Sequence, residues 1–114
     1  MIFSTLVTAA LLSAQADLGL EVDISRIVIR QSPDRFPCAG RMALGCFRVA
    51  RATLPSGEVR EYGIFTYSFG DTRSIGSHGT LREIVAHESV HAVRWLAGDP
   101  DWTRHDDATA GKRR

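Results

Sequence analysis

The 114-residue sequence predicts one α+β domain with an N-terminal helix, a short antiparallel or mixed sheet of three to four strands, and a second helix. Three patterns predict this class. Apolar residues recur at helical spacing in residues 1–16, β-branched and alternating segments fill the middle, and a capped amphipathic segment follows. A hydrophobic content of 44% and a charged content of 24% are typical of a globular chain.

Composition also excludes several classes of protein. The formal net charge of +1 gives no global electrostatic reason to expect binding to nucleic acid or to an anionic membrane. No apolar run reaches the length of a transmembrane helix, so we expect no integral membrane association. Two cysteines exclude a disulfide-dense scaffold and any four-cysteine metal site.

Residues 1–16 (MIFSTLVTAALLSAQA) support two interpretations. Alanine and leucine favour helix, and one face gathers Phe3, Leu6, Val7, Ala10, Leu11 and Ala14. The favoured interpretation is the first helix of a single domain spanning residues 1–114 of a cytoplasmic protein. The alternative is a signal peptide ending at Ala14-Gln15-Ala16, which would make the protein secreted or periplasmic. No Lys or Arg occurs before Arg26, so the basic start of a signal peptide is missing.

The middle of the chain predicts strands. Residues 27–29 are β-branched and end at a Ser-Pro-Asp turn, and residues 46–52 alternate between apolar and charged. Residues 55–57 form a turn, and residues 59–69 are rich in aromatic and β-branched side chains. Gly63 lies inside that strand, where we expect a bulge.

Cys38 and Cys46 flank seven residues and could face each other across a hairpin. In an oxidising compartment they would form a disulfide, and in the cytosol they would be buried free thiols. A role as zinc ligands is the third alternative, although the chain offers better ligands elsewhere.

A helix from Leu81 to Ala97 is marked at both ends. Thr80 and Glu83 form a capping box at its start. Gly98 follows as the C′ residue, and Pro100 prevents continuation. Its apolar face combines Leu81, Ile84, Val85, Ala92, Trp95 and Leu96.

Three residues of this helix form the motif HExxH, namely His87, Glu88 and His91. Residues at i and i+4 stack on one helix face, so both imidazoles can bind one zinc ion, Zn²⁺. Glu88 is then placed to act as general base and afterwards as general acid. The alternative is two surface histidines on an ordinary amphipathic helix.

A catalytic zinc needs a third protein ligand, and we expect it to be His105, fourteen residues beyond His91. The alternatives are Asp99, Asp101 and His78. Asp106 or Asp107 could hydrogen-bond a ligand imidazole from behind.

The HExxH helix followed by a later histidine resembles the SprT-like family of small zinc metallopeptidases. The similarity covers residues 25–107, through residues 27–29, 39–41, 64–67, 81–92 and His105. It implies a minimal zincin-like domain and a protein substrate linked to DNA. It also implies that residues 64–67 form the edge strand that pairs with the substrate. The oxyanion would be stabilised by Tyr62, Tyr67 or an arginine.

The sequence therefore predicts a monomeric zinc metallopeptidase that hydrolyses peptide bonds through zinc-activated water, with His87, His91 and His105 as ligands and Glu88 as base. Its expected partner is a peptide or protein substrate. Nucleic acid is a possible partner only because of the resemblance to the SprT-like family. One alternative is a zinc-stabilised, catalytically silent binding module, such as a prophage or accessory protein. The others are a secreted zincin with a Cys38–Cys46 disulfide and a nucleic-acid-binding module.

Overall fold

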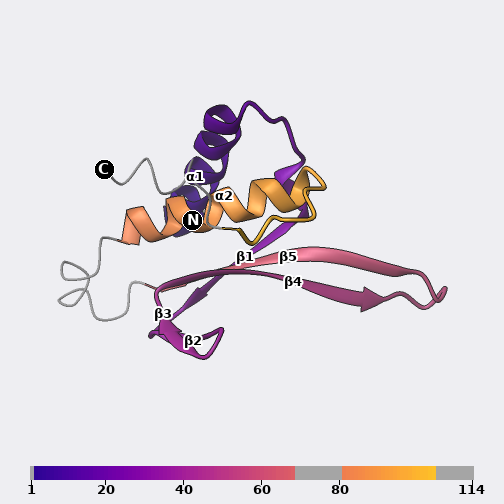
Figure 1. The fold of residues 1–114 in the computed structure, drawn as a ribbon. Coiled ribbons are helices and arrows are strands. Elements are labelled where there is room, and N and C mark those ends of the chain that lie inside the picture. The colour runs from indigo at the N-terminus through magenta and orange to yellow at the C-terminus, as the bar shows by residue number, and fades with distance from the viewer. Residues whose placement is uncertain (1, 69–80, 105–114) are drawn as a thin grey trace.

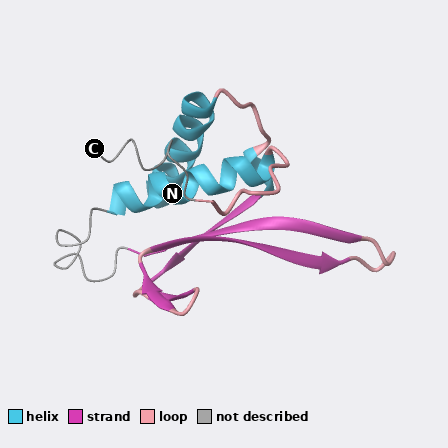
Figure 2. Ribbon diagram, viewed as in Figure 1, coloured by secondary structure: helices cyan, strands magenta, loops and turns pink. Residues whose placement is uncertain are grey.

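The computed structural model describes residues 2–68 and 81–104. Its elements, in chain order, are helix α1 (Ile2–Leu18), the 3-10 turn η1 (Ile24–Arg26), strands β1 (Ile27–Ser32), β2 (Phe36–Cys38), β3 (Arg41–Ala43), β4 (Gly45–Thr53) and β5 (Val59–Ser68), and helix α2 (Leu81–Leu96). Both helices lie on one side of the strands, and the β4–β5 hairpin extends beyond them (Figures 1 and 2). The predicted α+β class is confirmed.

The main sheet has the strand order β1-β5-β4. β1 runs parallel to β5, with Ile29 opposite Phe65, and β4 runs antiparallel to β5, with Phe47 opposite Phe65. β5 is therefore the central strand and β4 is an edge strand. The prediction that residues 64–67 form the edge was wrong, because β4 and β1 flank β5 on its two sides.

A second, two-stranded sheet pairs β2 with β3 and was not predicted. Phe36 lies opposite Ala43, and Cys38 lies opposite Arg41. The two residues between the strands, Ala39 and Gly40, both have positive φ angles, of 53° and 81°. Such angles are typical of a tight two-residue hairpin turn. Each strand has only three residues, too few for a visible period-2 pattern.

A disulfide joins Cys38 in β2 to Cys46 in β4, with 6.3 Å between the Cα atoms. The interpretations as free thiols or as zinc ligands were therefore wrong. The two cysteines also do not face each other across one hairpin, since they lie in different sheets. The bridge instead attaches the β2–β3 hairpin to the edge strand.

The hydrophobic core lies between the sheet and the two helices. From α1 it receives Val7, Leu11 and Ala14, which confirms the predicted apolar face at these positions. The other core side chains are Ile27, Leu44, Phe47, Phe65, Tyr67, Leu81, Val85, Ala92 and Val93. Residues 1–16 thus supply three core side chains, and the cellular compartment stays a prediction.

Both helices end in the same motif. The N–H of Gly98 donates to the Trp95 carbonyl at 2.9 Å, and that of Asp99 donates to the Arg94 carbonyl at 3.0 Å. Gly98 has a φ of 83°, which confirms the predicted C′ glycine. Gly19 ends α1 in the same way, with a φ of 67°. The predicted capping box at Thr80 lies outside the described residues.

Gly63 does not form the predicted bulge, because it pairs in register with Ile27 on one side and Val49 on the other. A Cβ atom there would lie 2.6 Å from the Phe47 ring and 2.7 Å from the Ile27 side chain. Glycine is therefore needed because neighbouring side chains pack directly over the backbone.

Within residues 2–68 and 81–104, neither helix combines the length and the apolar character that a membrane span requires.

Candidate metal centre

Helix α2 brings His87, Glu88 and His91 together, with their ligand atoms all within 4.8 Å of one another. The two histidines lie one turn apart, and their Nε2 atoms are 3.2 Å from each other. Two nitrogens that bind one zinc tetrahedrally at 2.0–2.1 Å lie about 3.3 Å apart, so the observed spacing fits a shared ion. The three predicted residues therefore form a cluster that could hold a metal ion.

The His91 imidazole is oriented by a backbone carbonyl that contacts Nδ1, the ring nitrogen on the side away from His87. It is 6% exposed, and its Nδ1 lies 2.8 Å from the Trp102 carbonyl oxygen. A carbonyl only accepts, so this contact places the proton on Nδ1 and leaves the Nε2 lone pair for a metal. The predicted partners Asp106 and Asp107 lie outside the described residues. The Trp102 carbonyl could not be predicted from the sequence, because a backbone acceptor has no residue signature.

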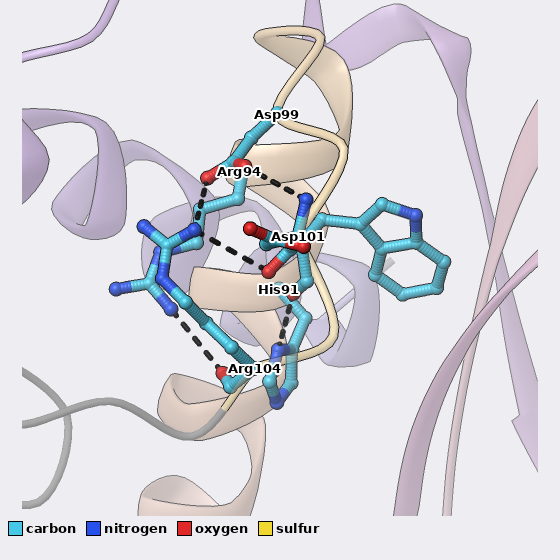
Figure 3. A network of polar contacts seen from close by, with 6 residues as sticks. His91, Arg94, Asp99, Asp101 and Arg104 are labelled. Atoms are coloured by element: carbon cyan, nitrogen blue, oxygen red, sulfur yellow. Dashed lines mark hydrogen bonds and ion pairs between the residues drawn. The ribbon is translucent and has the colours of Figure 1, made fainter.

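The loop that carries Trp102 is held by a polar network (Figure 3). Arg94 is 3% exposed, and its Nη1 donates to the Arg104 carbonyl at 3.4 Å. The Arg104 guanidinium in turn donates to Asp99 Oδ2 at 2.7 Å. The N–H of Asp101 donates to Asp99 Oδ1 at 2.9 Å. These contacts fix residues 99–104 against the end of α2.

The same contacts lower the pKa of Asp99. The largest cause is the hydrogen bond from the Asp101 N–H, and the bond and charge of Arg104 act in the same direction. All three favour the charged carboxylate. Asp99 therefore keeps its negative charge, and its ion pair with Arg104, at any neutral or mildly acidic pH.

Aromatic packing holds this loop on the sheet. The Phe47 ring of β4 lies 5.8 Å from the Trp95 ring and meets the Trp102 ring edge-on at 5.6 Å. The Arg26 guanidinium covers Trp95 at 4.8 Å from the ring centre. One side chain of the edge strand thus contacts both α2 and the loop that orients His91.

Glu88 reaches from α2 to the edge strand. Its Oε1 accepts a hydrogen bond of 3.0 Å from the Phe47 N–H. Gly45, two residues before Phe47, allows β4 to approach α2 this closely, because a Cβ at this position would lie 2.8 Å from Ile84 Cγ2 and 4.0 Å from Glu88 Cγ. The carboxylate is therefore fixed by a contact with a residue 41 positions away in the sequence.

The disulfide is directly adjacent to this contact. Cys46 lies between Gly45, which packs on α2, and Phe47, whose N–H holds Glu88. The bridge therefore fixes the part of the edge strand that positions the carboxylate.

The predicted third ligand, His105, lies outside the described residues, and so does the alternative His78. Asp99 and Asp101 do not join the cluster, which among the described residues consists of His87, Glu88 and His91. Both carboxylate oxygens of Asp99 are engaged in the loop network, which explains its absence.

Among the described residues, three further polar side chains are fully buried, namely those of Tyr67, Ser68 and Ser89. Tyr67, a predicted oxyanion stabiliser, is 2% exposed in the core, and burial raises the pKa of its phenol. Ser89 follows Glu88 on α2 and was not singled out in the sequence. Its Oγ is buried and has no hydrogen-bond partner among the described residues.

No protein-family model, curated protein or solved structure matches the chain. The chemistry of the candidate metal centre is therefore inferred from its own residues.

Proposed function

We propose that this protein is a zinc-dependent metallopeptidase in which His87 and His91 bind the metal and Glu88 is the general base. The observation that carries the proposal is the cluster on α2, with ligand atoms within 4.8 Å of one another. Two imidazoles with an adjacent carboxylate are a donor set suited to zinc.

Zinc, when bound, would act as a Lewis acid that polarises the scissile carbonyl and lowers the pKa of a coordinated water. Glu88 would take the proton from the attacking water and deliver it to the leaving amine. Its hydrogen bond from the Phe47 N–H holds the carboxylate in a fixed position next to the two imidazoles. The Trp102 carbonyl would keep His91 in the tautomer that binds through Nε2.

His105 is the proposed third ligand. The chain is anchored up to the residue that precedes it, because the Arg104 carbonyl accepts a hydrogen bond from Arg94 at 3.4 Å. A catalytic site has three protein ligands and an open position, whereas a structural site is closed by a fourth.

Membership of the SprT-like family is part of this proposal. It is supported by an HExxH helix that follows a sheet with an antiparallel edge strand. The substrate would be a peptide or protein, and β4 replaces residues 64–67 as the strand to which an extended substrate would bind.

The test compares the wild type with Glu88→Gln. The glutamine amide keeps an oxygen that can accept from Phe47 N–H, so the fold and zinc binding should persist while proton transfer is lost. We expect one zinc per chain in both proteins by elemental analysis, and at least a 100-fold loss of peptide hydrolysis in the variant, about the contribution of a general base.

Glu58→Gln, an exposed residue before β5, serves as the control and should keep full activity. Zinc without hydrolysis in the wild type would indicate the metal-stabilised binding module instead. Hydrolysis that survives Glu88→Gln would exclude Glu88 as the base, and a protein without zinc would overturn the proposal.

A further inference from the structure

A groove of about 770 Å³ runs between the two helices. α1 packs against α2 (Figure 1), and both contribute to its walls. Five lining residues are small: Ala9, Ala10, Ser13 and Ala14 on α1 and Ala86 on α2. Because side chains at these positions are small, they leave open space between α1 and α2, and this space forms the groove.

The groove borders the candidate metal centre at His87. His87 is one of its lining residues, and its Nε2 lies 3.2 Å from that of His91. Glu88, the next residue, points to β4 instead, where Phe47 N–H donates to it. Two consecutive residues of α2 thus have different neighbours: His87 lines the groove, and Glu88 contacts the edge strand β4.

The walls of the groove are mainly aliphatic, from residues such as Leu6, Ala10, Ala14 and Val90. Charged side chains occur as well, from Asp17, Arg82 and Glu83, and they carry both signs. A concave site with apolar walls and few polar groups favours an apolar ligand, because water is released from both surfaces. Mixed charge gives no preference for a cation or an anion.

Resting on the proposed peptidase function, we propose that this groove binds apolar residues of the peptide substrate on one side of the scissile bond. A volume of about 770 Å³ lies in the range of pockets that enclose a drug-sized ligand, so it exceeds the needs of one side chain. The preferred substrate is therefore an unfolded or extended segment with aliphatic or aromatic residues next to the cleaved bond.

The first test narrows the groove. Ala9 is an exposed α1 residue that lines it, and Ala9→Leu adds three carbons without removing a helix former. Peptides with leucine beside the cleaved bond should lose at least tenfold in kcat/KM, whereas matched glycine peptides should change less than twofold. Ala16→Leu, at an exposed alanine of α1 outside the groove, is the control and should leave both peptides unaffected.

The second test needs no turnover. In full-length Glu88→Gln, whose intact mass shows that α1 is present, alanine methyl groups are labelled and observed by NMR. N-acetyl-leucinamide should shift the Ala9, Ala10 and Ala86 methyl signals, and N-acetyl-glycinamide should not.

The two experiments separate the two proposals. Cleavage without an apolar preference, or methyl signals that do not move, would overturn the groove assignment and leave the peptidase standing. Methyl shifts in a protein whose wild type cleaves no peptide would refute the proposed peptidase function. The assignment of the groove to a peptide substrate would then be refuted as well.

Discussion

The two helices end in the same glycine motif but bury different chemistry. Among residues 5–18 of α1, the buried side chains are Val7, Leu11 and Ala14, and all three are apolar. α2 buries apolar residues as well, but also Ser89, His91 and Arg94. α1 is therefore held by hydrophobic burial, whereas α2 brings polar groups into the interior.

A buried polar group is costly unless it has a partner. Partners for three polar side chains of α2 come from outside the helix. The loop that follows α2 supplies the Trp102 carbonyl for His91 and the Arg104 carbonyl for Arg94, and the distant strand β4 supplies the Phe47 N–H for Glu88. α1 therefore contributes mainly stability, whereas α2 carries the residues of the candidate metal centre. Five predictions test this division, beginning with the largest expected effect.

Leu11→Ala should lower the free energy of unfolding by about 3 kcal/mol, because it leaves a cavity at a side chain that is 1% exposed. The loss should be the same with zinc and with a chelator, since α1 carries none of the predicted ligands. Urea denaturation measures it. Leu12→Ala, at a neighbour that is 52% exposed, should cost far less, and equal losses would refute the packing of α1.

Zinc at 100 times its dissociation constant should stabilise the wild type by about 2.7 kcal/mol, through preferential binding to the folded state. In His91→Ala this gain should disappear, because one of two neighbouring ligands is gone. Thermal unfolding with and without added zinc measures both. A variant that keeps the full gain would show that His91 is not a ligand.

Replacing both Cys38 and Cys46 with serine should lower the free energy of unfolding by about 2.5 kcal/mol, the chain-entropy value for a loop of this length. The disulfide fixes β4 next to Phe47, whose N–H donates to Glu88. This variant therefore tests how much the attachment of β4 contributes to the packing of α2 on the sheet. Denaturation of the wild type under reducing conditions should give a similar value. No change in either measurement would mean that the disulfide contributes nothing to stability.

Asp99→Asn should weaken zinc binding about tenfold, as expected for residues that orient a ligand indirectly. The variant loses the ion pair that fixes the loop behind His91. Competition with a chelating dye measures zinc affinity, and Asp34→Asn in the β1–β2 turn is the control. An unchanged affinity would show that the loop does not orient His91.

The same residue predicts a pH dependence. The folded state lowers the pKa of Asp99 below 3.8, so its stabilising contribution is complete above about pH 5 and is lost as the pH falls through the lowered value. Asp99→Asn should therefore lose less stability than the wild type on acidification. Parallel acid unfolding curves for the two proteins would contradict this.

Much of the fold could be predicted from local sequence patterns. The first helix, the strands over residues 27–29 and 46–52 and the C′ glycine at position 98 were all visible in the sequence. Each depends on spacing or on a residue type within a few positions. The β2–β3 hairpin was missed because its strands are too short to show a pattern.

The candidate site divides in the same way. His87, Glu88 and His91 were predicted as a cluster because i and i+4 stack on a helix, and the structure places them together. Trp102 was missed, because it acts through its backbone carbonyl. The identity of the edge strand was wrong, since the order of strands depends on pairing between segments far apart in the chain.

The sequence by itself determined where the helices form and end, and which side chains α2 presents on one face, because these follow from backbone geometry over one or two turns. Only the tertiary structure decided that β4 is the edge strand, that Phe47 N–H holds Glu88, and that a groove opens beside His87. Those features arise from contacts between distant segments, and their register depends on how the whole core packs.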